Sequence, residues 1–218
     1  MTKIAVIDYD MGNLHSACKG LEFAGATPIV TDSVAEMDRA DGVVLPGVGA
    51  FDPAMQHLRS RNLVDPIRRI ATSNKPFLGI CVGLQLLFEG SEEGSEPGIG
   101  AFSGTIRKFK SEPGITIPHM GWNQLQITQP DCPIWKDIAS DAWVYFVHSY
   151  YAEPIDDSIK AATVTHGSQT VTAAVAKGNL MAVQFHPEKS STTGLKILSN
   201  FVSYVQQTQR QPVGVAGG

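Results

Sequence analysis

A cysteine between glycines, in the run GICVG at residues 79–83, is the residue best placed to do covalent chemistry. An apolar run precedes Cys81 and an apolar helical pattern follows it, which predicts a strand-to-helix turn at the cysteine. Gly-x-Cys-x-Gly is the thiol counterpart of the nucleophile elbow, whose sharp turn projects the central side chain. Gly79 and Gly83 make room for so tight a turn, and the helix N-terminus favours a thiolate. The backbone N–H of Val82 would then point to the place where an oxyanion forms.

A histidine and a glutamate two residues apart, in the run HPE, supply a candidate base and a group to orient it. Pro187 keeps the preceding residue extended, and side chains two apart on extended backbone face the same way, so His186 and Glu188 should be neighbours. A carboxylate beside an imidazole fixes its tautomer and stabilises the charged ring. Taken singly, the motifs also fit a buried cysteine and an ordinary surface histidine. Taken together, Cys81, His186 and Glu188 favour a cysteine-dependent hydrolase.

A second glycine-rich turn, PGVGAF, follows another predicted strand. It fails as a dinucleotide-binding fingerprint, because Asp52 stands where the third glycine belongs and Pro46 breaks the expected turn. It is either a plain structural turn or a loop in which Gly47 and Gly49 free the backbone to offer N–H groups to an anionic oxygen. Sites in open parallel sheets form at the carboxyl ends of the strands, which would bring this loop beside the cysteine.

The other histidines and cysteines suggest no second site. We expect surface positions for His15 and His57, and hydrogen-bonded structural roles for His119, His148 and His166. Cys18 lies on a predicted helix and is expected in the core, whereas Cys132 lies in a proline-flanked loop without a partner. The sequence has no CxxC, HExxH or DxDxDG pattern and no Walker-type loop, so we predict no metal site and no cofactor.

The elements that would position these residues alternate between strands and helices in the first half of the chain. The predicted strands are compact apolar runs at residues 3–8, 42–45 and 76–80. The predicted helices cover residues 14–24, with Asn13 as N-cap and Gly25 as the stop, and residues 82–88. Asp52-Pro53 and Asp65-Pro66 each resemble an N-cap followed by proline at the first helical position. Continuous apolar strands between helices indicate a parallel sheet covered on both faces.

The second half of the chain is richer in strands and ends in a helix. Predicted strands occupy residues 115–117, 142–147, 161–165 and 171–176, with turns at Gly167-Ser168 and Gly178-Asn179. The last helix places apolar residues on one face: Leu195, Leu198, Phe201, Val202 and Val205. We therefore predict one α/β domain over residues 1–207, with an open, mixed, mostly parallel sheet and helices on both faces. Residues 208–218 are expected to form a disordered tail.

Composition and charge exclude several classes of protein. The 218 residues include 17 Lys or Arg and 21 Asp or Glu, a net charge of −4, which argues against general nucleic-acid binding. The chain is 43% hydrophobic, enough for a full core. No apolar run approaches the ~20 residues that span a membrane, and the N-terminus does not resemble a signal peptide. Three widely spaced cysteines argue against a disulfide framework, so we expect a cytoplasmic protein.

Several segments together resemble the class I glutamine amidotransferases. They run from IDYDMGNLHS through PGVGAF, GICVGLQLLFE, PHMGWN and YFVHSYY to AVQFHPEKS, and so cover nearly the whole chain. The cysteine turn and HPE mark the broad family. PHMGWN and the opening DYDMGN are similar to those members that supply ammonia for histidine biosynthesis. The acidic loop at residues 89–100 and the C-terminal tail fall outside the pattern.

The resemblance implies glutamine as the substrate and the triad Cys81, His186 and Glu188 as the catalytic residues. It implies an oxyanion hole formed by the N–H groups of Val82 and of the loop at Val48 and Gly49. Glutamine contacts are implied for further residues: Gly47, Gly49, Gln85, Ser149 and Tyr150. The expected products are glutamate and ammonia, with no cofactor.

The resemblance also implies a heterodimer with a (β/α)8-barrel cyclase, which uses the ammonia to make imidazole glycerol phosphate and AICAR. The ammonia must arrive unprotonated, because NH₄⁺ is no nucleophile, so a sealed passage through the interface is expected. By analogy, the residues on or near the docking face are Asn13, His119, Met120, Gly121, Trp122, Asn123, Tyr145 and Lys189. Packing within the subunit is the alternative for Trp122 and Tyr145, and a solvated charge is the alternative for Lys189.

Three other functions stay open. A cysteine peptidase or deglycase could use a similar turn, although Gln85 and the HPE pair argue against it. A glutaminase of pyridoxal phosphate, GMP or anthranilate synthesis is disfavoured by PHMGWN. A catalytically dead binding subunit is disfavoured by the intact triad.

The glycines on both sides of Val48 predict a switch. The peptide plane there can turn over at little steric cost and present either a carbonyl or an N–H to the site. We therefore expect the isolated subunit to be a poor glutaminase that its partner activates.

Overall fold

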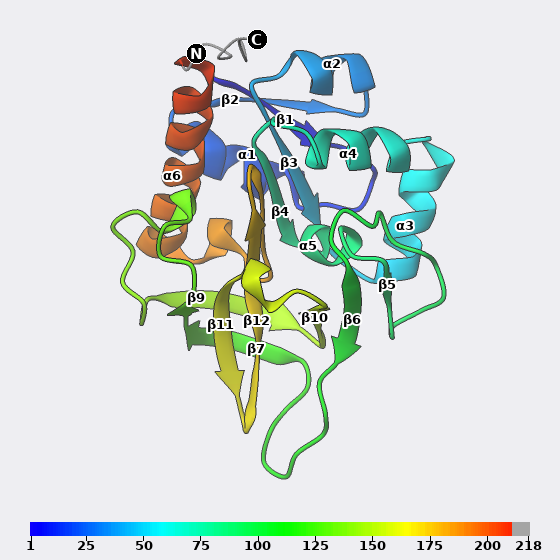
Figure 1. The fold of residues 1–218 in the computed structure, drawn as a ribbon, viewed down its shortest axis with the longest axis vertical. Coiled ribbons are helices and arrows are strands. Elements are labelled where there is room, and N and C mark those ends of the chain that lie inside the picture. The colour runs from blue at the N-terminus through cyan, green and yellow to red at the C-terminus, as the bar shows by residue number, and fades with distance from the viewer. Residues whose placement is uncertain (211–218) are drawn as a thin grey trace, which may run out of the picture.

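Within residues 1–210, which the computed structural model describes, the apolar runs form an eight-stranded sheet (Figure 1). The parallel strands, in order across the sheet, are β2 (Thr27–Thr31), β1 (Lys3–Ile7), β3 (Gly42–Gly47), β4 (Phe77–Cys81) and β13 (Leu180–Val183). The antiparallel strands that complete it are β12 (Gln169–Lys177), β11 (Lys160–His166) and β8 (Gln126–Ile127). This order confirms the predicted α/β fold with a mixed, mostly parallel sheet.

Helices cover both faces of the parallel strands, as strands that are apolar throughout require. On one face, α1 (Leu14–Phe23) packs against α6 (Ser191–Arg210); on the other lie α3 (Phe51–Ser60), α4 (Val64–Ala71) and α5 (Val82–Leu86) (Figure 1). An ion pair of 2.8 Å between Asp38 and Arg69 joins α2 (Val34–Arg39) to α4. No helix within residues 1–210 is both long enough and apolar enough to cross a bilayer.

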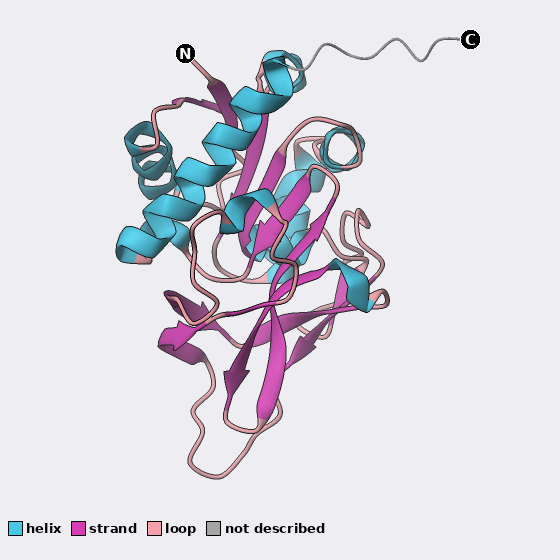
Figure 2. Ribbon diagram, turned by 60° about the vertical axis from the view of Figure 1, so that its left-hand side comes forward, coloured by secondary structure: helices cyan, strands magenta, loops and turns pink. Residues whose placement is uncertain are grey.

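Two smaller sheets among the described residues lie at the end toward which β3 and β4 point (Figure 1). One contains β10 (Tyr150–Pro154), β6 (Gly104–Lys108) and β5 (Gly90–Ser91), and the other contains β7 (His119–Gln124) and β9 (Trp143–His148). Figure 2 shows helices gathered around one end of the molecule and mostly strands and loops at the other. Of the strands in these two sheets, the sequence analysis predicts only β9, and it does not predict separate sheets.

The two predicted Asp-Pro helix starts are each wrong by two residues. The Asp52-Pro53 helix begins at Phe51, and the Asp65-Pro66 helix begins at Val64. The Asp52 carboxylate instead accepts the backbone N–H groups of residues 95 and 96 at 2.9 and 3.0 Å, and so fastens the acidic loop to α3. Each proline still falls within the first helical turn, where a missing N–H costs nothing.

Three further boundaries differ from prediction. Residues 115–117 form no strand, because prolines at 113 and 118 bracket them and cannot donate ladder hydrogen bonds. α5 ends at Leu86, one half-turn earlier than expected. α6 continues through residues 208–210, which were expected in the tail, and the rest of that tail, residues 211–218, lies outside the described residues.

Candidate active site

Cys81 lies at the turn from β4 to α5, as the sequence predicts. Its φ of 55° and ψ of −113° are a conformation that residues with a side chain rarely adopt, and such strain gathers at functional sites. Close packing holds it in place. A Cβ on Gly83 would lie 2.0 Å from the carbonyl oxygen of Leu45, and a Cβ on Gly79 would lie 3.0 Å from the Cβ of Ala182. The turn therefore tolerates only glycine at its tightest contact.

The glycine-rich loop that follows β3 lies directly beside this turn. β3 pairs with β4 in a register that sets Gly47 opposite Cys81, so the expected neighbourhood is confirmed. A Cβ on Gly47 would lie 2.6 Å from the nitrogen of Gly83 and 2.7 Å from the hydroxyl of Tyr9. The buried Tyr9 hydroxyl donates to the carbonyl oxygen of Pro46 at 2.9 Å. Burial and the charge of Cys81 raise the pKa of Tyr9, so this hydroxyl stays a donor.

The tip of this loop is held in one orientation by a single backbone hydrogen bond. The N–H of Val48 donates to the carbonyl oxygen of Met11 at 3.2 Å. This N–H, which was expected to face an oxyanion, is already engaged and is not available to one. Gly49 has a φ of 89°, and its missing Cβ would meet only the end of the Met11 side chain, at 3.0 Å. The loop tip is thus far less tightly packed than the cysteine turn.

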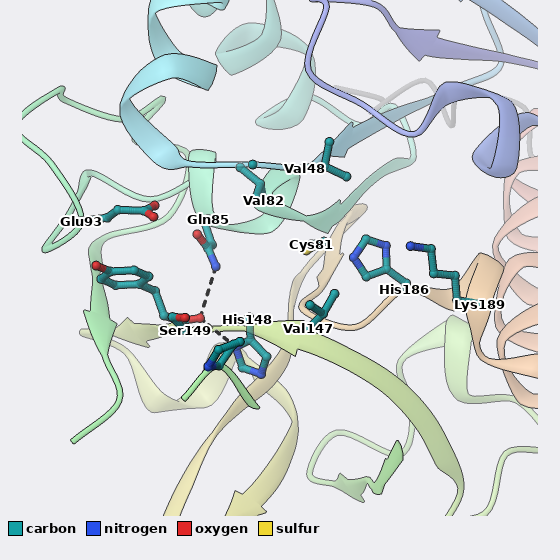
Figure 3. A pocket seen from close by; sticks show the side chains of 13 residues that line it. Val48, Cys81, Val82, Gln85, Glu93, Val147, His148, Ser149, His186 and Lys189 are labelled. Carbon is teal, nitrogen blue, oxygen red and sulfur yellow. Dashed lines mark hydrogen bonds between the residues drawn. The ribbon is translucent and has the colours of Figure 1, made fainter. Parts of the chain in front are cut away.

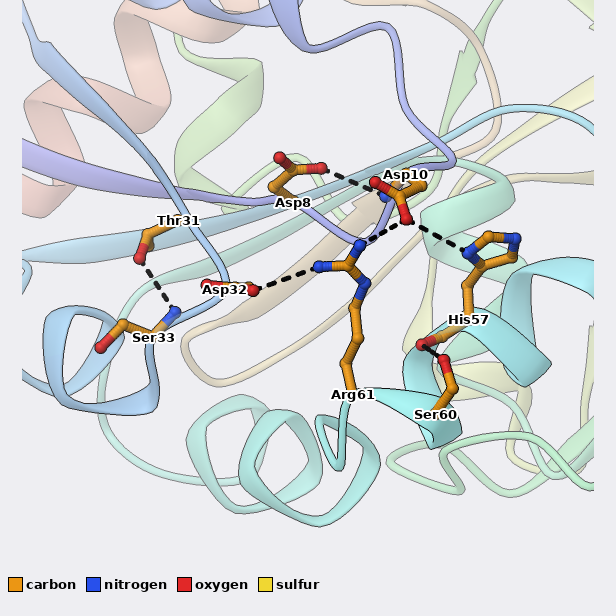
Figure 4. Close-up of polar contacts among 8 residues, drawn as sticks. All are labelled: Asp8, Asp10, Thr31, Asp32, Ser33, His57, Ser60 and Arg61. Carbon is orange, nitrogen blue, oxygen red and sulfur yellow. Dashed lines mark hydrogen bonds and ion pairs between the residues drawn. The ribbon is translucent and has the colours of Figure 1, made fainter.

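The segment that carries Met11 is fastened by an arginine from beyond the end of α3 (Figure 4). The Arg61 guanidinium bonds the carboxylate of Asp10 and, at 3.1 Å, the carboxylate of Asp32. Asp10 has a φ of 68°, so its backbone is strained as well as clamped. Asp10 immediately precedes Met11, and the clamp therefore helps to set where the Met11 carbonyl points.

His186 and Glu188 form the buried pair that the sequence predicts. Nδ1 of His186 lies 2.7 Å from Oε1 of Glu188, and the two side chains are 3% and 4% exposed. The backbone N–H of His186 donates to the carbonyl oxygen of Tyr145 at 3.0 Å, which connects this turn to β9. Burial opposes a charge on His186, but its contacts with Cys81 and Glu188 outweigh burial and raise the His186 pKa to about 10. The ring is thus held as an imidazolium beside the cysteine.

Gln85, one turn along α5 from Cys81, is fixed by two acceptors. Its Nε2 donates to Oε1 of Gln184 at 3.1 Å and to the carbonyl oxygen of Tyr150 at 3.2 Å. Both amide hydrogens are thereby used, which leaves the Gln85 oxygen free to accept a hydrogen bond. Gln184 is fully buried, and its Nε2 lies 3.9 Å from Sγ of Cys81. The sequence analysis missed Gln184, although a glutamine inside the apolar run LMAVQF was the signal.

A pocket of about 440 Å³ opens onto these groups (Figure 3). The predicted site residues that line it are Val48, Gly49, Cys81, Val82, Gln85, Ser149, Tyr150, His186 and Lys189. Gly47 and Glu188 do not line it: Gly47 packs against Gly83 of the cysteine turn, and Glu188 contacts the ring of His186. In Figure 3, Cys81, Val48 and His186 lie toward one end of the pocket, and Gln85 and Glu93 toward the other.

Glu93 is a pocket residue that sequence reasoning missed. It comes from the acidic loop at residues 89–100, and its Oε2 accepts the N–H of Phe51 at the start of α3, at 2.8 Å. Pro118, Val147 and His148 also line the pocket without having been predicted to do so. Only the folding of the acidic loop against α3 brings Glu93 here, and no local pattern in the sequence indicates it.

Strand β7 divides the expected docking residues between two faces. Met120 and Trp122 are 62% and 48% exposed, whereas His119 is only 3% exposed. His119 was expected on or near the docking face; its side chain faces the interior, because alternate residues of a strand face opposite ways. Asn123 also bonds inward, to the carbonyl oxygen of Thr165 at 2.8 Å.

The other expected docking residues stay predictions. Half-buried Tyr145 packs edge-on against Trp122, with ring centroids 6.0 Å apart, and Lys189 is exposed at the pocket edge. The Asn13 side chain caps α1 by accepting the N–H of Ser16 at 3.4 Å, as the sequence analysis expects of an N-cap. Gly121 is half-buried with a φ of 126°.

The remaining cysteines and carboxylates form no second centre. Cys18 is half-buried against the core, Cys132 is buried, and all three cysteines are free. Within residues 1–210, no group of three or more His, Cys, Asp or Glu side chains is arranged to hold a metal ion.

Comparison with known proteins agrees with this geometry. A family model described as glutamine amidotransferase class-I matches residues 5–204. The imidazole glycerol phosphate synthase subunit HisH of Trichodesmium erythraeum is 71% identical over 205 residues, covering 94% of this chain and 96% of that protein. The subunit of the same name from Acaryochloris marina is 68% identical over 212 residues, covering 97% and 99%. A solved structure described as PurLQS from Thermotoga maritima has a TM-score of 0.73 at 22% identity, covering 94% and 99%, and supports the fold alone.

Proposed function

The chain belongs to the class I glutamine amidotransferase family and is a glutaminase of the imidazole glycerol phosphate synthase type, and we propose that Cys81, His186 and Glu188 form its catalytic triad. The observation that carries the proposal is one pocket lined by a cysteine at a strained turn and by a buried imidazole, with the carboxylate 2.7 Å behind that ring. Cysteine beside imidazole, oriented by a third group, is the arrangement of an activated nucleophile.

The chemistry follows from the charge state of the pair. The raised pKa of His186 keeps its proton on the ring, next to the Cys81 sulfur. Cys81 Sγ attacks the side-chain amide carbon of glutamine, and the tetrahedral intermediate collapses as His186 gives its proton to the departing ammonia. The neutral ring then takes a proton from water, which attacks the γ-glutamyl thioester and releases glutamate and the thiol. Glu188 holds the ring orientation throughout, through Nδ1.

The oxyanion needs hydrogen-bond donors, and the backbone N–H of Val82 is one of them. Val82 is the first residue of α5, and the N–H groups in the first turn of a helix have no hydrogen-bond partner within the helix. The second donor is the N–H of Val48, once the peptide turns away from Met11. A missing oxyanion donor costs on the order of 10²–10³ in rate. We therefore propose that the free subunit is held in a slow state by the Val48–Met11 hydrogen bond.

Glutamine binding is proposed to use both ends of the pocket. The free oxygen of Gln85 accepts a hydrogen bond from the substrate, and backbone groups of Gly49, Ser149 and Tyr150 line the path to it. Glu93 places a carboxylate in a pocket whose substrate carries an α-ammonium group. We assign that group to Glu93, since an opposite charge is what orients a small zwitterion in a half-open site.

The partner is proposed to be the (β/α)8-barrel cyclase that makes imidazole glycerol phosphate and AICAR, docked as a heterodimer. Exposed Met120 and Trp122 on β7 offer the apolar anchors that interface centres use, and Lys189 lies at the pocket edge beside His186. A barrel over this face would receive ammonia before it is protonated. The reaction requires no cofactor of this chain, and the cytoplasmic location stays a prediction.

The test is to separate glutamine chemistry from ammonia use. In a complex with the cognate cyclase, Cys81→Ala should hydrolyse no measurable glutamine, whereas cyclase turnover with ammonium salts at high pH should persist. Glutamine hydrolysis persisting in this variant would contradict the assignment of the nucleophile. Cleavage of peptides instead of glutamine by the unaltered protein would favour a peptidase, and no turnover at all in the complex would favour a binding subunit.

A further inference from the structure

Two buried histidines that the proposed mechanism does not use are joined in a hydrogen-bonded row that reaches the substrate pocket. Nδ1 of His148 lies 2.8 Å from the carbonyl oxygen of Tyr150, and Nε2 of His148 lies 3.0 Å from Nδ1 of His119. Nε2 of His119 lies 3.1 Å from the amide nitrogen of Asn123. The two histidines are 5% and 3% exposed, so no bulk solvent competes for these contacts.

The row continues on the other side of the Tyr150 carbonyl. That oxygen also accepts one amide hydrogen of Gln85, and the other amide hydrogen of Gln85 goes to Gln184. Gln184 in turn directs its own amide at the sulfur of Cys81. The Tyr150 carbonyl is therefore the point where the histidine pair meets the groups that line the glutamine site.

The position of each proton in the row is fixed by its two ends. A carbonyl oxygen can only accept, so His148 must carry a hydrogen on Nδ1. In a neutral ring, Nε2 is then an acceptor and takes the hydrogen on Nδ1 of His119. Nε2 of His119 accepts from Asn123, whose second amide hydrogen goes to the carbonyl oxygen of Thr165 at 2.8 Å. Only two neutral rings, both protonated at Nδ1, satisfy every partner.

The surroundings favour that neutral state. Burial, with a smaller contribution from the neighbouring ring of His166, lowers the pKa of His148 to about 3 and that of His119 to about 4. His119 stacks between Phe146 and His166, with ring centroids 4.8 and 4.2 Å away, so neither rotation nor a charge is accommodated easily. The rings are thus held in place by packing as well as by hydrogen bonds.

We propose that His148 is a positioning residue for glutamine, and that His119 fixes its tautomer. The N–H of His148 holds the Tyr150 carbonyl where that oxygen takes one hydrogen of Gln85, so that the Gln85 oxygen faces the substrate. This inference rests on the proposed glutaminase function. Because the row touches the binding groups and leaves the Cys81–His186 pair intact, its loss weakens glutamine binding more than it slows the chemical step.

Kinetics of two matched variants test the role. The amide nitrogen of asparagine can take the place of Nδ1, whereas that of glutamine reaches only the place of Nε2. In the complex with the cyclase and its nucleotide substrate, His148→Gln should raise the KM for glutamine about five- to tenfold, the loss of one buried hydrogen bond, with kcat within about twofold. His148→Asn should recover most of that loss. Equal KM increases in both variants would mean that His148 acts only through packing, which would overturn the proposal. An unchanged KM in His148→Gln would overturn it as well.

The tautomers give a second test that needs no activity. Long-range ¹H–¹⁵N spectra of the ¹⁵N-histidine-labelled chain should show His119 and His148 neutral and protonated at Nδ1 from pH 6 to 8. Resonances are assigned with His119→Gln and His148→Gln. A proton on Nε2 of the His148 ring would overturn the row even if the variants lose activity. If the unaltered complex hydrolyses no glutamine while both tautomers are as expected, the proposed function fails and the row stands.

Discussion

The Cys81 turn and the loop of residues 46–49 are both glycine-rich, lie side by side and face the same pocket, yet they are held very differently. At the turn, a Cβ on Gly83 would lie 2.0 Å from a backbone oxygen. At the loop tip, Gly49 is exposed, and its missing Cβ would approach only a flexible methionine end. The proposed nucleophile is therefore locked by backbone packing, whereas the proposed oxyanion donor is held by one hydrogen bond, from Val48 to Met11.

The difference indicates which half of the site can be regulated. A nucleophile must be placed within fractions of an ångström at all times, and packing against backbone does this without ligand. An oxyanion donor can be withheld until it is needed. The peptide plane at Val48 lies between two glycines, so it can turn over without displacing a core side chain. The glycines thus serve close approach in one region and backbone freedom in the other.

The largest effect should come from filling the locked region. Gly83→Ala places a Cβ against the carbonyl of Leu45, and the overpacked turn should lose about 3 kcal/mol of unfolding free energy together with all glutaminase activity. Gly90→Ala is the matched control, since nothing lies within 4 Å of its added Cβ. Chemical denaturation and glutamine turnover of both variants check this. Equal stability in the two variants would mean that the turn is not locked.

The next largest effect separates the two supports of the nucleophile. His186→Ala removes the proton carrier and should lower kcat about 10⁴-fold, whereas Glu188→Gln should lower it about 10²-fold. Glu188 also helps to raise the pKa of His186, so its loss should move the alkaline limb of the kcat profile to lower pH. Profiles from pH 6 to 10 measure this. Equal residual rates, or a limb that moves to higher pH, would contradict the assigned roles.

Stiffening the movable region should have a smaller effect, confined to activation. Gly49→Pro forces a φ near −65° at a residue that has a φ of 89°, and it also restricts the backbone of Val48, whose N–H is the proposed donor. Stimulation of glutamine hydrolysis by the cyclase and its nucleotide substrate should fall about tenfold, while the affinity between the subunits stays unchanged. Titration calorimetry and coupled glutamate detection distinguish the two. Full stimulation in this variant would mean that the loop is not the switch.

The smallest effect should come from loosening the clamp on Met11. Arg61→Ala removes one of the two side chains that hold the Asp10 carboxylate, the other being His57 at 3.6 Å, and so weakens the hold on the Val48 N–H; the basal rate of the free subunit should rise about two- to fourfold. The rate of the fully stimulated complex should stay the same. Arg69→Ala, which breaks an exposed ion pair to α2, serves as the control. A basal rate that falls, or that rises equally in the control, would remove Arg61 from the account.

The sequence predicts the Cys81 turn better than the loop of residues 46–49, because the residues that build the turn lie close together in the chain. Strand, turn and helix around Cys81 occur in one continuous run, and His186 and Glu188 are two residues apart. Glu93 could not be placed, since only the folding of residues 89–100 against α3 brings it to the pocket. The inward direction of His119 depends on the pairing of β7 with β9, and the Val48–Met11 bond joins two loops distant in the chain.

The central claim, that the site is ready except for one withheld oxyanion donor, is tested most directly by one set of rates. Glutamine hydrolysis is measured for the free subunit, for its complex with the cyclase, and for that complex with the cyclase's nucleotide substrate. We expect kcat to rise by about 10²–10³ across the series, the contribution of one oxyanion donor, with a smaller change in KM. A free subunit that already runs at the rate of the liganded complex would contradict it.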